Sequence, residues 1–135
     1  MRTFKFTSVL FGILVLLGAC STTTSNEMQM KSCELNEREI QHMVIFNLPY
    51  PAGSVEAGKF LEDGTRILTA IPVVQDFQAF RQVSEKNDFQ YGFSMVFSNQ
   101  EDYNTYNMHP DHVAFVQERW MKEVTDFLEI DFKKP

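Results

Sequence analysis

The sequence predicts an α+β domain with the ferredoxin-like order β-α-β-β-α-β and an antiparallel sheet. Two observations carry this prediction. Four β-prone stretches follow residue 39, at 40–48, 74–83, 89–97 and 127–132. Two stretches whose apolar residues recur every three or four positions lie between the first and second strands and between the third and fourth. Together they form one domain of about 100 residues, with helices on one face of its sheet.

The first strand, 40–48, is almost continuously apolar, which is typical of a strand buried on both faces. Pro49 and Pro51 end it, because neither can donate a hydrogen bond to a neighbouring strand. The helices cover only one face of the sheet, so something else must cover the other. A second copy of the chain, packed sheet against sheet, is the simplest cover. Thirteen phenylalanines among 135 residues also favour a second buried surface. We therefore expect a homodimer.

Helical spacing follows the first strand. Ser54 is a candidate N-cap, Pro72 closes the stretch, and apolar positions recur at Ala57, Phe60, Leu61, Gly64, Leu68 and Ile71. Gly64 costs the helix about 1 kcal/mol relative to alanine. Its position on the apolar face predicts a close approach to the sheet.

The second half of the domain repeats the pattern. The strand at 74–83 and a turn at 84–88 lead into 89–97, where large and small residues alternate. The large face is expected to be core, and the small face is a candidate cavity wall; the latter consists of Gln90, Gly92, Ser94 and Val96. A short helix is expected at 101–108, and Pro110 opens a longer helix. Its apolar stripe is Val113, Val116, Trp120, Val124 and Phe127.

The N-terminus has the parts of a secretory signal over residues 1–19, with two early positive charges and an apolar run. The run from Phe6 to Leu17 falls short of the roughly 20 residues that span a bilayer, although an uncleaved anchor helix is the alternative. The segment Leu17-Gly18-Ala19-Cys20 resembles the lipobox of bacterial lipoproteins. That resemblance implies cleavage before Cys20, lipidation of Cys20, and attachment to a membrane of the cell envelope on the periplasmic or outer-membrane side.

Residues 20–39 are expected to be the lipidated cysteine and a flexible polar tether. Cys20 and Cys33 are otherwise a candidate disulfide, but a lipid on Cys20 leaves Cys33 as an unpaired thiol. Loss of Arg2 and Lys5 with the signal reduces the 12 basic residues to 10, against 18 acidic ones. So acidic a chain is expected to repel nucleic acid.

One motif resembles a known family. The segment from Tyr106 to Val116, which contains His109-Pro110-Asp111-His112-Val113, is similar to the signature of the stress-responsive dimeric α/β-barrel (Dabb) family. His42 in the first strand, Ile71-Pro72-Val73-Val74, Asn87-Asp88 and Asp131-Phe132 support the resemblance over residues 40–132, although the family often has glycine where Val73 stands. Membership implies a homodimer whose two sheets form one barrel with apolar cavities; related barrels include polyketide cyclases and small monooxygenases.

The candidate catalytic residues are Tyr106 and His112. A histidine near neutral pKa accepts a proton from carbon or oxygen, and a tyrosine hydroxyl donates to a developing enolate. In cyclase members of the family the matching tyrosine and histidine have these roles. The alternative is that His112 only binds a backbone carbonyl and holds the loop. His42, Val44, Phe46 and His109 are candidate ligand-binding residues, and His109 is also a candidate helix cap or dimer contact.

Other chemistry has little support in the sequence. It contains no glycine-rich phosphate loop, no Gly-x-Ser-x-Gly turn and no Cys-x-x-Cys pair, and no cofactor is expected. No metal site is expected, and a site formed by His109, Asp111 and His112 is a weaker alternative. Two hypotheses follow: a barrel that binds a small apolar or aromatic ligand, or a cofactor-independent enzyme that acts on one. A tethered scaffold without an enclosed cavity is a third.

Overall fold

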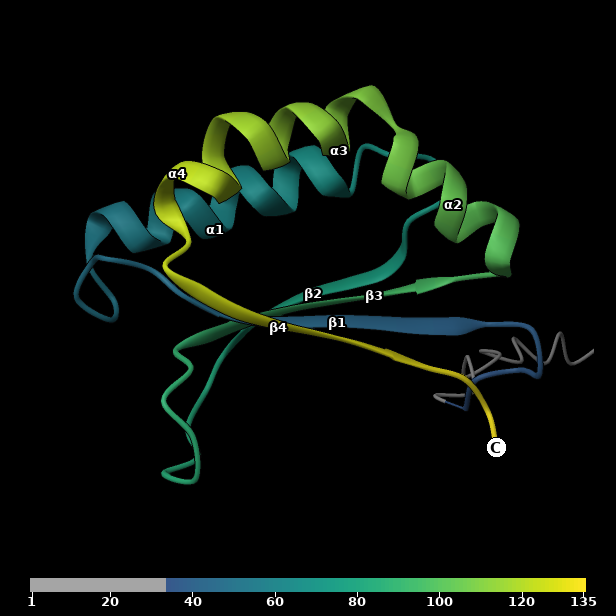
Figure 1. Cartoon of the computed structure of the whole chain (residues 1–135), viewed down its shortest axis with the longest axis horizontal. Helices are drawn as coiled ribbons and strands as arrows, with labels where there is room; N and C mark the ends of the chain where they lie inside the picture. Colours follow the sequence, from purple (N-terminus) through teal and green to yellow (C-terminus); the bar gives the residue numbers. More distant parts are fainter. Residues whose placement is uncertain (1–33) are drawn as a thin grey trace, which may run out of the picture. The chain divides into compact units, whose positions relative to one another are not determined.

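The structure, a computed structural model, describes residues 34–135. The expected signal peptide, Cys20, Cys33 and most of the expected tether lie outside the described residues. Four strands and two helical stretches follow one another in the order β-α-β-β-α-β, which confirms the predicted fold class (Figure 1). The elements are β1 (Ile40–Asn47), α1 (Val55–Leu68), β2 (Gln75–Arg81), β3 (Tyr91–Phe97), α2 (Gln100–Met108), α3 (Pro110–Phe115), a π-helical turn η1 (Val116–Trp120), α4 (Met121–Glu123) and β4 (Asp126–Phe132).

The sheet has the strand order β2-β3-β1-β4, and each neighbouring pair is antiparallel. All the helices lie on one face of it (Figure 1). Ile40, His42, Val44 and Phe46 of β1 are buried on the helix side, whereas the alternate residues of this strand are only half-buried. The strand is therefore central, but within a single chain its second face is not covered. Among the described residues, no helix is long and apolar enough to cross a membrane.

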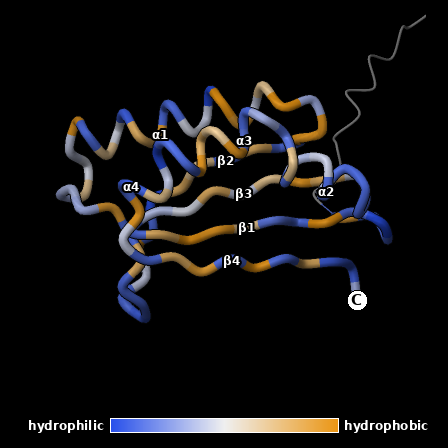
Figure 2. Tube along the Cα trace, turned by 45° about the horizontal axis from the view of Figure 1, so that its top comes forward, coloured by the Kyte–Doolittle hydropathy of each residue, from blue (hydrophilic) through white to orange (hydrophobic). Residues whose placement is uncertain are grey.

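The uncovered face of the sheet is apolar. The register places Phe80 opposite Gly92, Leu128 opposite Ile45, and Phe132 opposite Gln41, all on the side away from the helices. Phe80, Leu128 and Phe132 are each between 43% and 48% exposed. Figure 2 shows that hydrophobic residues continue along β1, β3 and β4. We call this surface the open face.

Helix α1 is held against the sheet by aromatic packing. The Ser54 side chain accepts a hydrogen bond from the Ala57 N–H at 3.2 Å, as predicted for the N-cap. A Cβ atom at Gly64 would lie 2.8 Å from Cζ of Phe93, so the predicted close approach is confirmed. The helix ends at Leu68, earlier than predicted, because turns through Ile71 precede Pro72.

The alternation in β3 places Tyr91, Phe93, Met95 and Phe97 in the core, as expected. The opposite face, the candidate cavity wall, does not line the cavity described below. Gly92, Ser94 and Val96 are buried on the open face, where Ser94 accepts a hydrogen bond from the Gln41 side chain at 2.5 Å. The cavity described below lies on the aromatic side, because only that side is covered by helices.

The helix that begins at Pro110 differs from the predicted stripe. Val113 is 38% exposed and Phe115 is buried in its place, while Val124 and Phe127 lie beyond the last helical residue, Glu123. The π-helical turn is the physical reason for part of the difference. A π turn contains an extra residue, so side chains after it do not follow the spacing of an α-helix. The turn keeps Trp120 on the side that faces the sheet.

Candidate functional site

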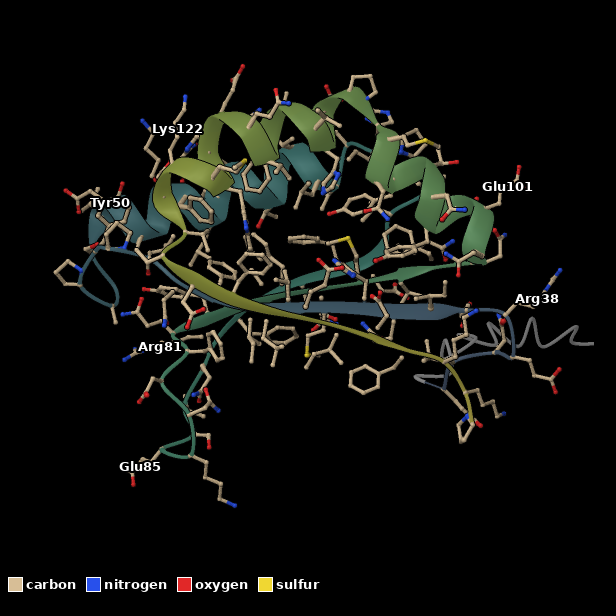
Figure 3. The ribbon with its side chains drawn as sticks, viewed as in Figure 1. Arg38, Tyr50, Arg81, Glu85, Glu101 and Lys122 are labelled. Carbon is tan, nitrogen blue, oxygen red and sulfur yellow. The ribbon has the colours of Figure 1, made fainter. Side chains whose placement is uncertain are left out.

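A cavity of about 420 Å³ lies between the sheet and the C-terminal helices. Side chains from the sheet and the helices fill the space around it, whereas the labelled Glu101 and Lys122 point outwards (Figure 3). Most of its wall is apolar and aromatic, and polar groups gather on one part of it. The lining residues are His42, Val44, Leu68, Phe93, Met95, Tyr106, Asn107, His112, Phe115, Val116, Trp120, Met121, Phe127 and Glu129.

His42 is the buried polar residue of β1. Its side chain is fixed from the neighbouring strand β4, where the register sets His42 opposite Asp131. The Nδ1 atom of His42 lies 2.7 Å from Oδ1 of Asp131. A carboxylate can only accept a hydrogen bond, so Nδ1 of His42 carries the proton in this contact. The rings of Tyr103 and Tyr106 pack on the imidazole at 5.6 and 6.0 Å between centroids.

Tyr106 and His112 are brought together by the break between α2 and α3. Their ring centroids are 4.2 Å apart and their planes are tilted by 35°. Nδ1 of His112 lies 3.3 Å from the backbone carbonyl of Asn107, which is the loop-holding hydrogen bond that the sequence left as an alternative. Since a carbonyl only accepts, Nδ1 is again the protonated nitrogen and Nε2 the acceptor.

Burial sets the charge state of this pair. It raises the pKa of the Tyr106 hydroxyl well above 10, with a smaller contribution from the negative charge of Glu129. It also lowers the pKa of His112 below 6.5, because a buried imidazole loses hydration when it is charged. At neutral pH the cavity therefore contains a protonated phenol beside a neutral imidazole. These are the forms that a hydrogen-bond donor and a general base require.

Two of the predicted ligand contacts do not line the cavity. Phe46 is completely buried behind the wall and packs on Phe93 and Trp120 at 5.0 and 4.9 Å. His109 is the N-cap of α3, where its Nδ1 accepts from the Asp111 N–H at 3.3 Å. Its capping geometry was one of the alternatives drawn from the sequence. The structure thus brings together His42, Val44, Tyr106 and His112, and places Phe46 and His109 outside.

Two residues that the sequence analysis did not single out, Tyr103 and Glu129, extend the polar group at the cavity towards Asp131. The Tyr103 hydroxyl lies 2.9 Å from Oδ2 of Asp131 and 3.3 Å from Oε1 of Glu129. The available signal was the alternation of the last strand, which sets Phe127, Glu129 and Asp131 on one face. Nothing in the sequence indicated that this face is the one towards the helices.

One group of side chains has the spacing of a metal site. The candidate ligand atoms of His42, Glu129 and Asp131 all lie within 4.8 Å of one another. The hydrogen bonds from His42 and Tyr103 already account for this grouping. Within residues 34–135 the alternative set of His109, Asp111 and His112 does not form such a group.

Comparisons with known proteins agree with the sequence motif. The family model described as the stress responsive A/B barrel domain matches residues 40–134. Among solved structures, a Dabb-family protein with a ferredoxin-like fold from Mesorhizobium loti is 48% identical; the match covers 73% of this chain and 98% of that one, with a TM-score of 0.71. No curated protein sequence gives a significant match.

Two more distant structures show the fold alone. A dimeric protein of unknown function with a ferredoxin-like fold from Bacteroides fragilis is 19% identical, covers 75% of this chain and 100% of its own, and has a TM-score of 0.58. The hydroxynitrile lyase of Passiflora edulis is 10% identical, covers 74% of this chain and 96% of its own, and has a TM-score of 0.65. A shared fold does not determine the function of a protein, so activity has to be argued from the site.

Proposed function

Because the chain belongs to the stress responsive A/B barrel domain family, we propose that it is a stress-related protein that binds a small apolar or aromatic ligand between its sheet and helices. The cavity carries this proposal. Its volume of about 420 Å³ lies in the range of small-molecule sites, which are mostly apolar with a few convergent polar groups. Here the apolar walls include Phe93, Phe115 and Trp120, and the polar groups come from β1, α2, α3 and β4.

Calorimetric titration with 2-naphthol, a flat aromatic alcohol, tests this proposal. We expect one molecule bound per chain. Val116→Phe adds a ring to the cavity wall and should weaken binding at least tenfold, which corresponds to about 1.4 kcal/mol. Gln117→Phe adds the same ring at the exposed neighbouring position and should leave binding unchanged. Equal binding by the two variants would remove the cavity as the site.

The same proposal includes a homodimer joined through the open face. Exposed Phe80, Leu128 and Phe132 provide an apolar surface that a second sheet would cover, and the Bacteroides fragilis structure of this fold is dimeric. Leu128→Glu would bury a charge at this interface, so the expected mass in solution is that of one chain. A wild-type protein that is already monomeric at micromolar concentration would contradict the dimer.

We also propose that Cys20 carries a lipid that anchors the protein to a membrane of the cell envelope. The support is the lipobox-like segment at residues 17–20. Acyl chains on Cys20 would anchor the protein, because each methylene buried in the bilayer strengthens membrane binding by about 0.8 kcal/mol. Cys20→Ser should block lipidation and therefore the cleavage that separates the signal segment from the rest of the chain. Processing of this variant identical to the wild type would refute lipidation.

A second candidate function is cofactor-independent acid–base catalysis, which the contact between Tyr106 and His112 favours. The neutral imidazole would take a proton from the carbon next to a carbonyl, and the Tyr106 hydroxyl would donate to the enolate oxygen. The geometry places both groups on one wall of the cavity, with the His42–Asp131 pair beside them.

Hydrogen exchange separates this function from simple binding. In D₂O, an enolising enzyme would exchange the acidic C–H protons of 2-tetralone for deuterium, and proton NMR would monitor the loss of their signals. His112→Ala should lower that exchange rate by about 10²–10⁴-fold while 2-tetralone still binds. Exchange at the uncatalysed rate with the wild-type protein, when 2-tetralone is bound, would leave binding as the function.

A further inference from the structure

The charge of the cavity wall is uneven. Glu129 is the one carboxylate among the lining residues, and no lysine or arginine of the described chain lines the cavity. His112 donates its Nδ1 proton to the Asn107 carbonyl, and burial lowers the pKa of this imidazole, so its Nε2 is an acceptor towards the cavity. A ligand in the cavity therefore meets one carboxylate and the polar groups of Tyr106, Asn107 and the two histidines, without a lysine or arginine.

Glu129 lies where the cavity meets solvent. It is on the edge strand β4, directly opposite Val44, whose side chain forms part of the floor. Met121 and Phe127, which also line the cavity, are 75% and 52% exposed. These three residues mark the mouth of the cavity, between α4 and β4. The ring of Trp120 meets Phe127 edge-on at 5.7 Å just inside it.

The carboxylate of Glu129 has capacity left for a ligand. Tyr103 has a single hydroxyl proton, and Asp131 lies closer to that oxygen than Glu129 does, at 2.9 Å against 3.3 Å. The proton therefore goes to Asp131. The oxygen atoms of Glu129 then remain as acceptors beside an aromatic wall, a combination suited to an N–H or O–H donor.

We propose that Glu129 sets the ligand class: the ligand is an aromatic molecule with a hydroxyl or ammonium group that donates to this carboxylate at the mouth, and aromatic carboxylates are rejected. The proposal rests on the ligand-binding function proposed above. Two physical terms act in the same direction. A hydrogen bond to a charged acceptor is stronger than a neutral one, and a ligand carboxylate would meet a like charge with no lysine or arginine on the wall to offset it.

Three naphthalene probes of similar shape test the proposal by calorimetry on the full chain in a nonionic detergent: 2-naphthol, 2-naphthylmethylamine and 2-naphthoate. We expect the alcohol and the amine to bind at least about tenfold more tightly than the carboxylate. Glu129→Gln keeps the shape of the side chain but removes its charge. It should weaken amine binding about tenfold and reduce the discrimination against naphthoate by a similar factor.

Glu118→Gln is the matched control, because Glu118 lies on the outer side of the helix and away from this cavity. It should leave all three affinities unchanged. If naphthoate binds the wild type as tightly as the amine, or if Glu129→Gln leaves the ratio of amine to naphthoate affinity unchanged, Glu129 does not select the ligand, although ligand binding stands. If none of the three probes binds the wild type, the proposed ligand-binding function fails as well.

Discussion

Replacement of Gly64 by alanine should destabilise the domain through the wall of the cavity. The added Cβ would lie 2.8 and 2.9 Å from two atoms of the Phe93 ring and 3.2 Å from Phe115. Phe93 packs on Phe46 and Phe77 at 5.0 and 5.2 Å, and Phe115 packs on Phe60 at 5.7 Å, so each ring has to move against these neighbours or into the cavity. Overpacking of this kind costs about 1–3 kcal/mol. Alanine returns about 1 kcal/mol through helix propensity, so the net loss is about 0–2 kcal/mol.

Gly58 gives a matched control on the same helix. A Cβ there meets nothing within 4 Å, so Gly58→Ala should stabilise the domain by up to about 1 kcal/mol. The two variants should then differ by about 1–3 kcal/mol in free energy of unfolding, the cost of overpacking alone. Urea denaturation with the slope held in common measures this difference. Equal stabilisation by both substitutions would refute the packing argument. Gly64→Ala should also weaken 2-naphthol binding, since Phe93 and Phe115 line the cavity.

Three further predictions concern charge and hydrogen bonding. Burial lowers the pKa of His112, so as the pH falls through 6.5 this histidine is protonated in the unfolded chain before it is protonated in the folded one. The stability that the residue contributes is therefore present above that pH and lost below it. His112→Asn should reduce the pH dependence of the urea midpoint between pH 5 and 8. Tyr106→Phe should change the free energy of unfolding by less than about 0.5 kcal/mol, since no hydrogen bond fixes the hydroxyl within the described residues. In an absorbance titration the variant should show one tyrosine fewer that ionises above the usual pH range. Arg119 pairs with Asp63 and Glu123 and lies 5.5 Å from the Phe60 ring, so Arg119→Ala should lower the free energy of unfolding by about 1–2 kcal/mol. The Arg66 side chain is 70% exposed, so Arg66→Ala should lower it by less than about 0.5 kcal/mol.

The sequence determined the fold class because periodicity is a local property. Alternation in 89–97 and the near-continuous apolar run at 40–48 identified the two central strands. The order of these elements indicated the ferredoxin-like topology, the motif around His109 and His112 indicated the family, and the match to the family model confirmed the family. The stripe after Pro110 was less accurate, because a π-helical turn changes the spacing and leaves no sign in composition.

The site was predictable only in part. The motif that contains Tyr106 and His112 marked two wall residues, and the first strand with its place in the family pattern marked His42 and Val44. Glu129 was missed, and Asp131 was marked only through the family resemblance and not as a site residue, because the importance of an edge strand depends on which face the helices cover. That is settled by long-range packing rather than by local spacing.

Methionine methyl NMR tests the location of the ligand most directly. Met95 and Met121 line the cavity, whereas Met43 is on the open face and Met108 is exposed at the end of α2. Titration with 2-naphthol should move the methyl resonances of Met95 and Met121 and leave those of Met43 and Met108 in place. Shifts confined to Met43 would place the ligand on the open face and contradict the account.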